Sequence, residues 1–152
     1  MIRSMINQLT YISDTITQLF DYIDEKVLSK HPIENKMTVW EVCVHLAQIP
    51  QADLLICKGY KADQMQLYYE KSKPVNIQAA KEQLLEGIQE VIKHIEQLTE
   101  ETLSKEFTTY WGSEYRTGEW FLQIMNHLVH HRMQLYSYLL VLKRDMQVVL
   151  FR

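Results

Sequence analysis

Glycine and proline are scarce in this chain, and their scarcity limits the possible folds more than any other feature. The 152 residues include only four glycines and three prolines. No window shows the sustained apolar–polar alternation of a surface strand, whereas apolar residues recur at three- and four-residue steps. Helices should therefore dominate, and the few helix-breaking residues should mark where the helices end.

Breaking and capping residues delimit the first two predicted helices. The first is predicted over residues 2–29 and ends before Pro32, because the residue preceding a proline avoids helical dihedral angles. Thr38 and Glu41 have the spacing of a capping box, in which a hydroxyl and a carboxylate each bond a backbone N–H at the start of a helix. A second helix should therefore begin at Thr38 and reach Lys58, with Gly59 at its C-terminal end.

Two further helices follow. Pro50 lies inside the second helix and should bend its axis just past His45, because proline removes a backbone hydrogen bond. The third helix is predicted over residues 77–98, with Asn76 as its N-cap. Thr117 is the candidate N-cap of the fourth helix, which should end near residues 143–144.

The stretch between the third and fourth helices, residues 104–116, is predicted to be a long ordered loop, because its aromatic side chains need a surface to pack against. Four long amphipathic helices in a chain of this length indicate an all-α four-helix bundle. One core of this size makes a single domain over residues 1–152 the expected organisation.

Composition excludes several classes of function. Sixteen basic and nineteen acidic residues give a formal charge of −3, and no run of five like charges is present, which argues against nucleic-acid binding. No apolar stretch is long enough to span a membrane, and the first residues do not resemble a signal peptide. Two cysteines are typical of the reducing cytoplasm. We therefore expect a cytoplasmic protein without nucleic-acid or membrane partners. Separately, we expect its substrate to be a small molecule.

Three histidines lie close together in the last predicted helix. His127 and His131 fall within a continuous apolar row at helical spacing, whereas His130 lies on the flank of that row, beside Arg132 and Met133, which we expect to be exposed. His127 and His131 are therefore the predicted inward pair. The apolar members of the row are Trp120, Ile124, Leu135, Tyr138 and Leu142.

Two interpretations of the inward pair are possible. Unpaired imidazoles among apolar side chains are costly, and a shared cation would remove that cost. Alternatively, both are core histidines bonded to backbone carbonyls or water. His45 is a third candidate ligand, because it lies on the Val42 and Ile49 side of the second helix and facing helices are where bundles build metal sites. Three neutral nitrogen ligands leave a coordination position open for water or substrate.

Two residues near His45 fit less well as ligands. Cys43 is two positions away and points to nearly the opposite side of the helix, so it is predicted to be a core thiol. Glu41 shares a face with His45, but its capping role competes with any role at a metal site. No catalytic residue is assigned.

Two segments carry a family resemblance: W-E-V-C-V-H-L-A around His45, and T-G-E-W-F-L-Q-I-M-N-H-L-V-H-H-R-M-Q-L from Thr117. They resemble the DinB/YfiT-like superfamily over nearly the whole chain, in helix number and in the order His, then His-x-x-x-His. The resemblance implies a bundle, often a homodimer, that binds zinc, nickel or a similar divalent ion through His45, His127 and His131. Where relatives commonly have R-G-Q after the last ligand, this chain has Met133 in place of the glycine.

The resemblance also suggests a reaction. Characterised relatives include transferases and isomerases that use low-molecular-weight thiols such as bacillithiol, mycothiol or glutathione. A metal ion with an open position would lower the pKa of a bound thiol and hold it as a nucleophile. The leading expectation is therefore a metal-dependent thiol S-transferase. A hydrolase that uses a metal-bound water is the nearest alternative, and a non-catalytic, stress-induced metal-binding bundle is an alternative of a different class.

Overall fold

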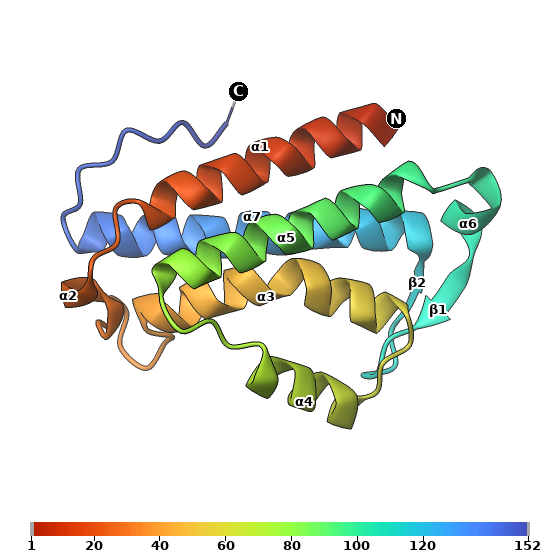
Figure 1. Ribbon diagram of the computed structural model, residues 1–152, viewed down its shortest axis with the longest axis horizontal. Coiled ribbons are helices and arrows are strands. Elements are labelled where there is room, and N and C mark those ends of the chain that lie inside the picture. The colour runs from red at the N-terminus through yellow and green to blue at the C-terminus, as the bar shows by residue number, and fades with distance from the viewer. Residues whose placement is uncertain (1, 152) are drawn as a thin grey trace.

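Four long helices form the body of the protein in a computed structural model that describes residues 2–151. Figure 1 shows them running roughly along one direction, as a bundle. The prediction of an all-α four-helix bundle is confirmed. The long helices are α1 (Ile2–Phe20), α3 (Val39–Cys57), α5 (Ile77–Glu96) and α7 (Thr117–Val141).

Short elements connect the long ones. In Figure 1, α4 lies beside α3, and α6 and the hairpin lie at the end of the bundle where α7 begins. The hairpin pairs two antiparallel strands, with Phe107 opposite Tyr115. Within residues 2–151 the short elements are α2 (Glu25–Leu28), α4 (Ala62–Lys71), α6 (Glu100–Ser104), β1 (Glu106–Thr108) and β2 (Glu114–Arg116).

The predicted ends of α3 are confirmed. The Thr38 hydroxyl accepts a hydrogen bond from the Glu41 backbone N–H at 3.1 Å, and the Glu41 carboxylate accepts one from the Thr38 N–H at 2.7 Å. Gly59 follows the C-cap Lys58 with φ of +89°, a left-handed conformation that favours glycine. Pro50 lies inside the helix as expected. The bend predicted past His45 stays a prediction.

Helices α5 and α7 end about two residues earlier than predicted, at Glu96 and Val141, and two other boundaries also differ. The first helix ends at Phe20 rather than at residue 29, because the Asp24 side chain accepts a hydrogen bond from the Lys26 N–H and starts the separate helix α2. Thr117 is the first residue of α7 rather than its N-cap. Its N–H and its hydroxyl both donate to the Lys105 carbonyl, at 2.9 and 3.0 Å, and tie the helix start to α6. By contrast, Asn76 caps α5 as predicted, accepting from the Ala79 N–H at 2.8 Å.

The stretch predicted as a loop, residues 104–116, is more regular than expected. Its first residue ends α6, and most of the remainder forms the β1–β2 hairpin. Helix α4 was not predicted from the sequence. It carries a single fully buried residue, Met65, so its apolar periodicity is weak.

Helix α3 is the most enclosed element and positions the functional site. It packs against α5, α7 and α4, and more than half of its side chains are buried. Such a helix is apolar around most of its circumference, so polar side chains on it stand out. No helix within residues 2–151 is long and apolar enough to cross a membrane.

Candidate metal centre

Three histidines meet where α3 packs against α7. His45 comes from α3, and His127 and His131 come from successive turns of α7. Each is half-buried and offers one ligand nitrogen, and these three atoms lie within 4.8 Å of one another. Nε2 of His45 is 3.1 Å from Nε2 of His127. The structure thus brings together the three histidines named by the sequence analysis.

Asp53, two turns beyond His45 on α3, holds His127 from the opposite side. Its Oδ2 lies 3.0 Å from Nδ1 of His127, and its backbone carbonyl accepts a hydrogen bond from the Trp120 indole at 2.8 Å. Burial raises the pKa of Asp53, and the hydrogen bond and charge interaction with His127 oppose that rise. A carboxylate at this distance accepts the Nδ1 proton of His127, which leaves Nε2 as a lone-pair acceptor.

Gln134 has the same effect on His131. Its Oε1 lies 2.7 Å from Nδ1 of His131, and its amide nitrogen donates to the Tyr138 hydroxyl at 3.3 Å. An amide oxygen can only accept, so Nδ1 of His131 carries the proton and Nε2 is again an acceptor. Two of the three imidazoles therefore present lone pairs toward the centre of the group.

The environment also favours the neutral form of two of the imidazoles, those of His45 and His131. Burial lowers the pKa of His45 to about 4, with smaller contributions from His131 and His127. Burial likewise lowers the pKa of His131, although its hydrogen bond with Gln134 opposes this. Neutral imidazole is the form that binds a metal ion.

This donor set fits a divalent cation. With Nε2 of both His127 and His131 acting as acceptors, one proton on His45 Nε2 can satisfy only one of them. An ion at the centre would accept all three lone pairs. Zinc–nitrogen bonds of about 2.0–2.1 Å in tetrahedral geometry separate ligand nitrogens by about 3.3 Å, close to the 3.1 Å between His45 and His127.

The other candidate residues lie outside this group. His130 is exposed and touches His131 edge-on, with ring centroids 4.7 Å apart. Cys43 is completely buried, and burial raises the pKa of its thiol. Burial also raises the pKa of the half-buried Cys57. Glu41 is committed to capping α3 through Thr38.

One expectation on the flank of α7 is wrong. Met133 is exposed as predicted, but Arg132 is buried, with 8% of its surface accessible. Its guanidinium points toward α1 and donates to the Thr15 hydroxyl at 2.8 Å. The side chain is buried because it lies between α1 and α7, a contact that the histidine spacing alone did not indicate.

Asp53 and Gln134 were missed by the sequence analysis. For Asp53 a signal was available, since it is the one acidic residue of the apolar second half of α3 and lies eight positions, or about two turns, after His45. For Gln134 the signal was its position three residues after His131 on the same helix.

Two hollows flank the histidines, and Tyr69 of α4 lines both. One, which we call the aromatic hollow, has a volume of about 280 Å³ and includes Asp53 and His127 in its wall. The other has a volume of about 660 Å³ and includes His45 and Lys73. The aromatic hollow takes its name from Tyr69, Tyr110, Trp111, Tyr115 and Trp120, with Ile56 and Gln123 completing its wall.

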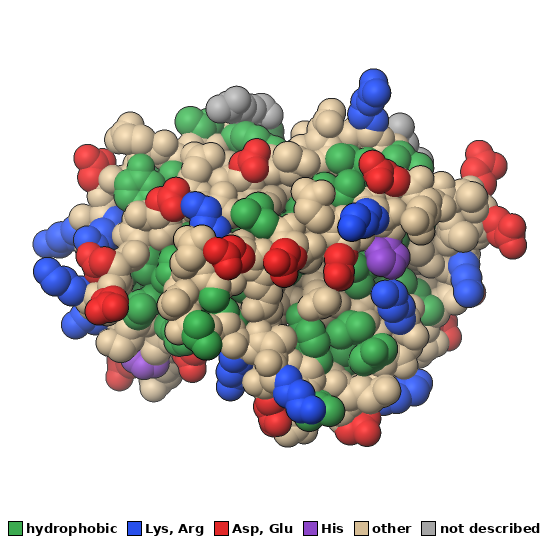
Figure 2. Space-filling model, viewed as in Figure 1, with side chains coloured by type: hydrophobic (Ala, Val, Ile, Leu, Met, Phe, Trp, Pro, Cys, Tyr) green, Lys and Arg blue, Asp and Glu red, His purple; other side chains and the backbone are tan. Residues whose placement is uncertain are grey.

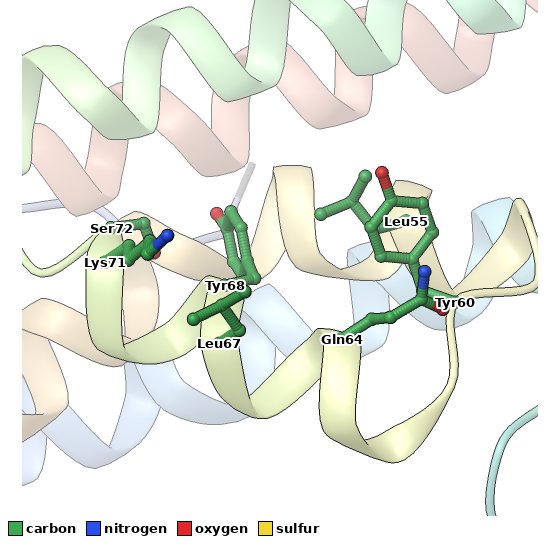
Figure 3. A pocket seen from close by; sticks show the side chains of 7 residues that line it. All are labelled: Leu55, Tyr60, Gln64, Leu67, Tyr68, Lys71 and Ser72. Carbon is green, nitrogen blue, oxygen red and sulfur yellow. The ribbon is translucent and has the colours of Figure 1, made fainter.

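A further hollow lies between α3 and α4, away from the histidines (Figure 3). It has a volume of about 410 Å³, and Leu55, Tyr60 and Tyr68 are among its lining residues. On the face shown in Figure 2, acidic and basic side chains are interspersed, with no extended area of one charge. Neither this hollow nor the charge distribution on that face indicates a binding site for a charged ligand.

The fold and site together define a helical bundle with a three-histidine group able to hold a metal ion. The sequence model of the DinB superfamily matches residues 8–135, and the chain belongs to this family. The family resemblance seen in the two histidine-containing segments is therefore confirmed. No curated protein matches the chain.

Solved structures agree with this assignment. The chain is similar to a protein assigned to the DinB family from Exiguobacterium sibiricum 255-15, with 32% identity, a TM-score of 0.89, and coverage of 99% of this chain and 97% of the other. DinB-like proteins from Bacillus subtilis (18% identity, TM-score 0.73, 96% and 95% covered) and Bacillus cereus ATCC 10987 (14%, 0.77, 97% and 96%) share the fold.

Proposed function

We propose that the protein is a metal-dependent enzyme that binds one divalent ion, zinc or nickel, through His45, His127 and His131, and that it is a low-molecular-weight-thiol S-transferase. One observation supports the metal site above all: three imidazole nitrogens converge while Asp53 and Gln134 engage the Nδ1 atoms of two of the rings. This arrangement favours a cation over a proton at the centre of the group.

The type of reaction follows from the number of ligands. Three protein ligands leave at least one coordination position open. A divalent ion there supplies charge that lowers the pKa of a thiol, so that the thiolate is available at neutral pH. In the transfer, the thiol sulfur forms a bond to an electrophilic carbon, the leaving group departs with its electron pair, and the thiol proton passes to solvent.

Neither cysteine of residues 2–151 is placed to act as a competing thiol nucleophile at the site. Cys43 is buried, and its thiol is held protonated by burial. Cys57 lies twelve positions beyond His45 on α3, about three turns away, and the pKa of its thiol is also raised. A nucleophile must therefore come from solution, as a thiol or, in the hydrolase alternative, as water.

Metal analysis tests the site directly. The purified protein should contain up to one divalent ion per chain, and a variant with His45→Ala, His127→Ala and His131→Ala should contain none. Stoichiometric binding by the triple variant would exclude the proposed ligands.

A cobalt-substituted protein tests the reaction class. Addition of a low-molecular-weight thiol should produce a sulfur-to-metal charge-transfer band, and Cys43→Ser with Cys57→Ser should leave that band unchanged. If no thiol changes the spectrum and the protein instead cleaves esters or amides, the hydrolase alternative replaces the transferase. If neither activity is found and metal removal only lowers the melting temperature, the ion is structural.

The outer face of α7 supports a further part of the proposal, that the protein is a homodimer. Leu122, Met133 and Leu140 lie along one side of this helix with about half of each side chain exposed. Acidic Glu119 lies in the first turn of α7 and basic Lys143 lies just beyond its C-terminal end, both exposed. An antiparallel α7 from a second copy would therefore match apolar with apolar and acidic with basic residues, as a two-fold interface requires.

Two further parts of the proposal are that the chain forms a single domain and that the protein is cytoplasmic. The four long helices contribute to one continuous hydrophobic core, which supports a single domain over the chain. Both cysteines are free thiols, which supports a reducing, cytoplasmic location.

A further inference from the structure

We propose that the aromatic hollow beside His127 binds a neutral, flat aromatic group, and that this group belongs to the electrophile that accepts the thiol. The assignment of the group to the electrophile rests on the proposed function. The binding of an aromatic group rests on the wall of the hollow alone and is tested separately from catalysis.

The wall is assembled from segments that are far apart in sequence. Tyr69 comes from α4, Tyr110 and Trp111 from the turn of the hairpin, Tyr115 from β2 and Trp120 from α7. The centroids of Trp111 and Trp120 are 6.1 Å apart, and those of Tyr115 and Trp120 are 5.0 Å apart. These separations are typical of interacting aromatic rings. Four of the five rings in the wall therefore already contact another ring of the hollow.

The rings are held in place without a ligand. The Trp120 indole donates to the Asp53 carbonyl at 2.8 Å, and the Trp111 indole donates to the Ser113 hydroxyl at 2.9 Å. In the hairpin turn, backbone and side-chain atoms of Thr109 and Ser113 are joined by hydrogen bonds of 2.8–3.0 Å. Gly112 closes this turn with φ of +93°. A preorganised wall loses little conformational entropy when a ligand binds.

Two of the rings remain substantially exposed. The accessible fraction of Tyr110 is 40% and that of Trp111 is 50%, although both lie against other aromatic side chains. Large aromatic side chains gain most from removal of their surface from water. A flat ring in the hollow would cover these surfaces, whereas nothing within the described chain does so.

The charges around the hollow favour a neutral ligand. Its lining residues include no lysine or arginine, so an anion has no cationic partner there. The carboxylate of Asp53 lies 3.0 Å from His127 in the same wall, and its negative charge disfavours an anion. A divalent ion on the other side of His127 would repel a cationic ligand. Lys73 instead lines the second hollow, beside His45.

The aromatic hollow lies next to the three-histidine group. His127 and Tyr69 line the aromatic hollow, while His45 and Tyr69 line the second hollow. The Nε2 atoms of His45 and His127 are 3.1 Å apart, so the two hollows lie on adjoining sides of the three-histidine group. An electrophile whose ring lies in the aromatic hollow would extend past His127 to reach the reacting thiol, and a two-substrate reaction needs both groups held beside one centre.

Ligand-observed NMR on the whole protein, with and without metal, tests the inference with three probes of similar size. The probes are 4-nitrobenzyl alcohol, which is neutral and flat, cyclohexylmethanol, which is neutral and saturated, and benzyltrimethylammonium, which is cationic. The nitrobenzyl probe should bind more tightly than the saturated probe in both metal states, and more tightly than the cationic probe in the metal-loaded protein. Trp111→Leu should weaken its binding about 2- to 12-fold, the range expected for one aromatic pair, whereas Trp111→Phe should retain most of it.

Tyr60→Leu is the matched control, because Tyr60 lines the separate hollow between α3 and α4. This variant should bind the nitrobenzyl probe as the unaltered protein does. Equal binding of the saturated probe, tighter binding of the cationic probe to the metal-loaded protein, or no effect of Trp111→Leu would each overturn the inference. Circular dichroism melting of each variant verifies that the exposed Trp111 can be replaced without unfolding.

Activity measurements then separate this inference from the proposed function. If thiol transfer is found, Trp111→Leu should raise the KM for an aromatic electrophile and leave the KM for iodoacetamide unchanged. If the probes bind as expected but no thiol is transferred, the aromatic hollow stands and the transferase assignment fails. If transfer is found but the KM values change equally, the hollow does not select the electrophile.

Discussion

The Asp53 carboxylate lies 3.0 Å from Nδ1 of His127 and joins α3 to α7 through a single hydrogen bond. The same residue is 5% exposed, so this bond is shielded from water. A buried carboxylate is expensive unless it is paired. Its presence is therefore best explained by its effect on His127, whose Nε2 it leaves free to act as a ligand.

The Asp53→Asn variant tests that relationship. The amide can donate as well as accept, so it no longer selects the Nδ1-protonated form of His127. Removal of such a partner commonly costs about 10- to 100-fold in metal affinity, and we expect a loss in that range in competition titrations with a chelator. Asp63→Asn, on the exposed part of α4, is the control and should bind normally. Unchanged affinity of Asp53→Asn would show that Asp53 does not orient the ligand.

The two neighbouring histidines of α7 should differ in their contribution to metal binding. His131 belongs to the three-histidine group, whereas His130 is exposed and offers no ligand atom to it. His131→Ala should therefore lose most of the metal, and His130→Ala should retain it, as measured by elemental analysis of the purified variants. The reverse order would mean that α7 is rotated about its axis relative to this structure.

The stability of the metal-free protein should decrease in mildly acidic solution. The pKa of His45 falls from an ordinary value of 6.5 to about 4 in the folded protein, chiefly through burial. Between these pH values the unfolded chain binds the proton more tightly, so the free energy of unfolding falls as pH drops from 6.5 towards 4. The lowered pKa of His131 acts in the same direction.

The pH effect can be measured by urea denaturation of metal-free protein at pH 7.5, 6.0 and 4.5. A full shift of this size corresponds to a loss of about 3 kcal/mol at most, and partial exposure of the site reduces it. His45→Gln should show a smaller slope over the same interval. If His45→Gln shows the same slope as the unaltered protein, groups other than His45 cause the pH dependence.

Replacement of the buried Arg132 by an apolar residue should not destabilise the protein. Its guanidinium donates to Thr15, but its Nε has no partner and no carboxylate lies within ion-pair distance among the described residues. Burial lowers its pKa. Arg132→Met should therefore keep or raise the free energy of unfolding, by about 1 kcal/mol. Thr15→Val removes the acceptor of the Arg132 hydrogen bond and should destabilise the protein by about 1–3 kcal/mol. Both values are accessible by chemical denaturation.

The oligomeric state should depend on the exposed apolar side of α7. Met133→Glu places a charge in the middle of the Leu122, Met133 and Leu140 row and should convert a dimer to a monomer, as measured by light scattering after size exclusion. Leu85→Glu is the control, because Leu85 is an exposed apolar residue of α5, a different helix. If both variants remain dimers, the interface lies elsewhere. If the unaltered protein is a monomer, the homodimer proposal is wrong.

The local features of the protein were predictable from the sequence. The caps at Thr38 and Asn76 are formed by side chains that bond backbone atoms three residues away. The inward direction of His127 and His131 follows from the helical repeat and from their apolar neighbours. Such interactions involve only nearby residues, so their pattern can be recognised without knowledge of the fold. Sequence patterns did not reveal α4, because its apolar periodicity is weak, and they did not reveal that Asp24 caps a separate helix.

Only the tertiary structure decided which side chains meet across the bundle. His45 and His127 are 82 positions apart, and their contact depends on how far α3 and α7 are rotated and shifted against each other. The pairing of Asp53 with His127, the burial of Arg132 against α1 and the assembly of the aromatic hollow depend on the same packing. Helical periodicity determines the face on which a side chain lies. The residue that it contacts on another helix is determined by packing of the whole core, because the contacts between helices determine their relative rotation and shift.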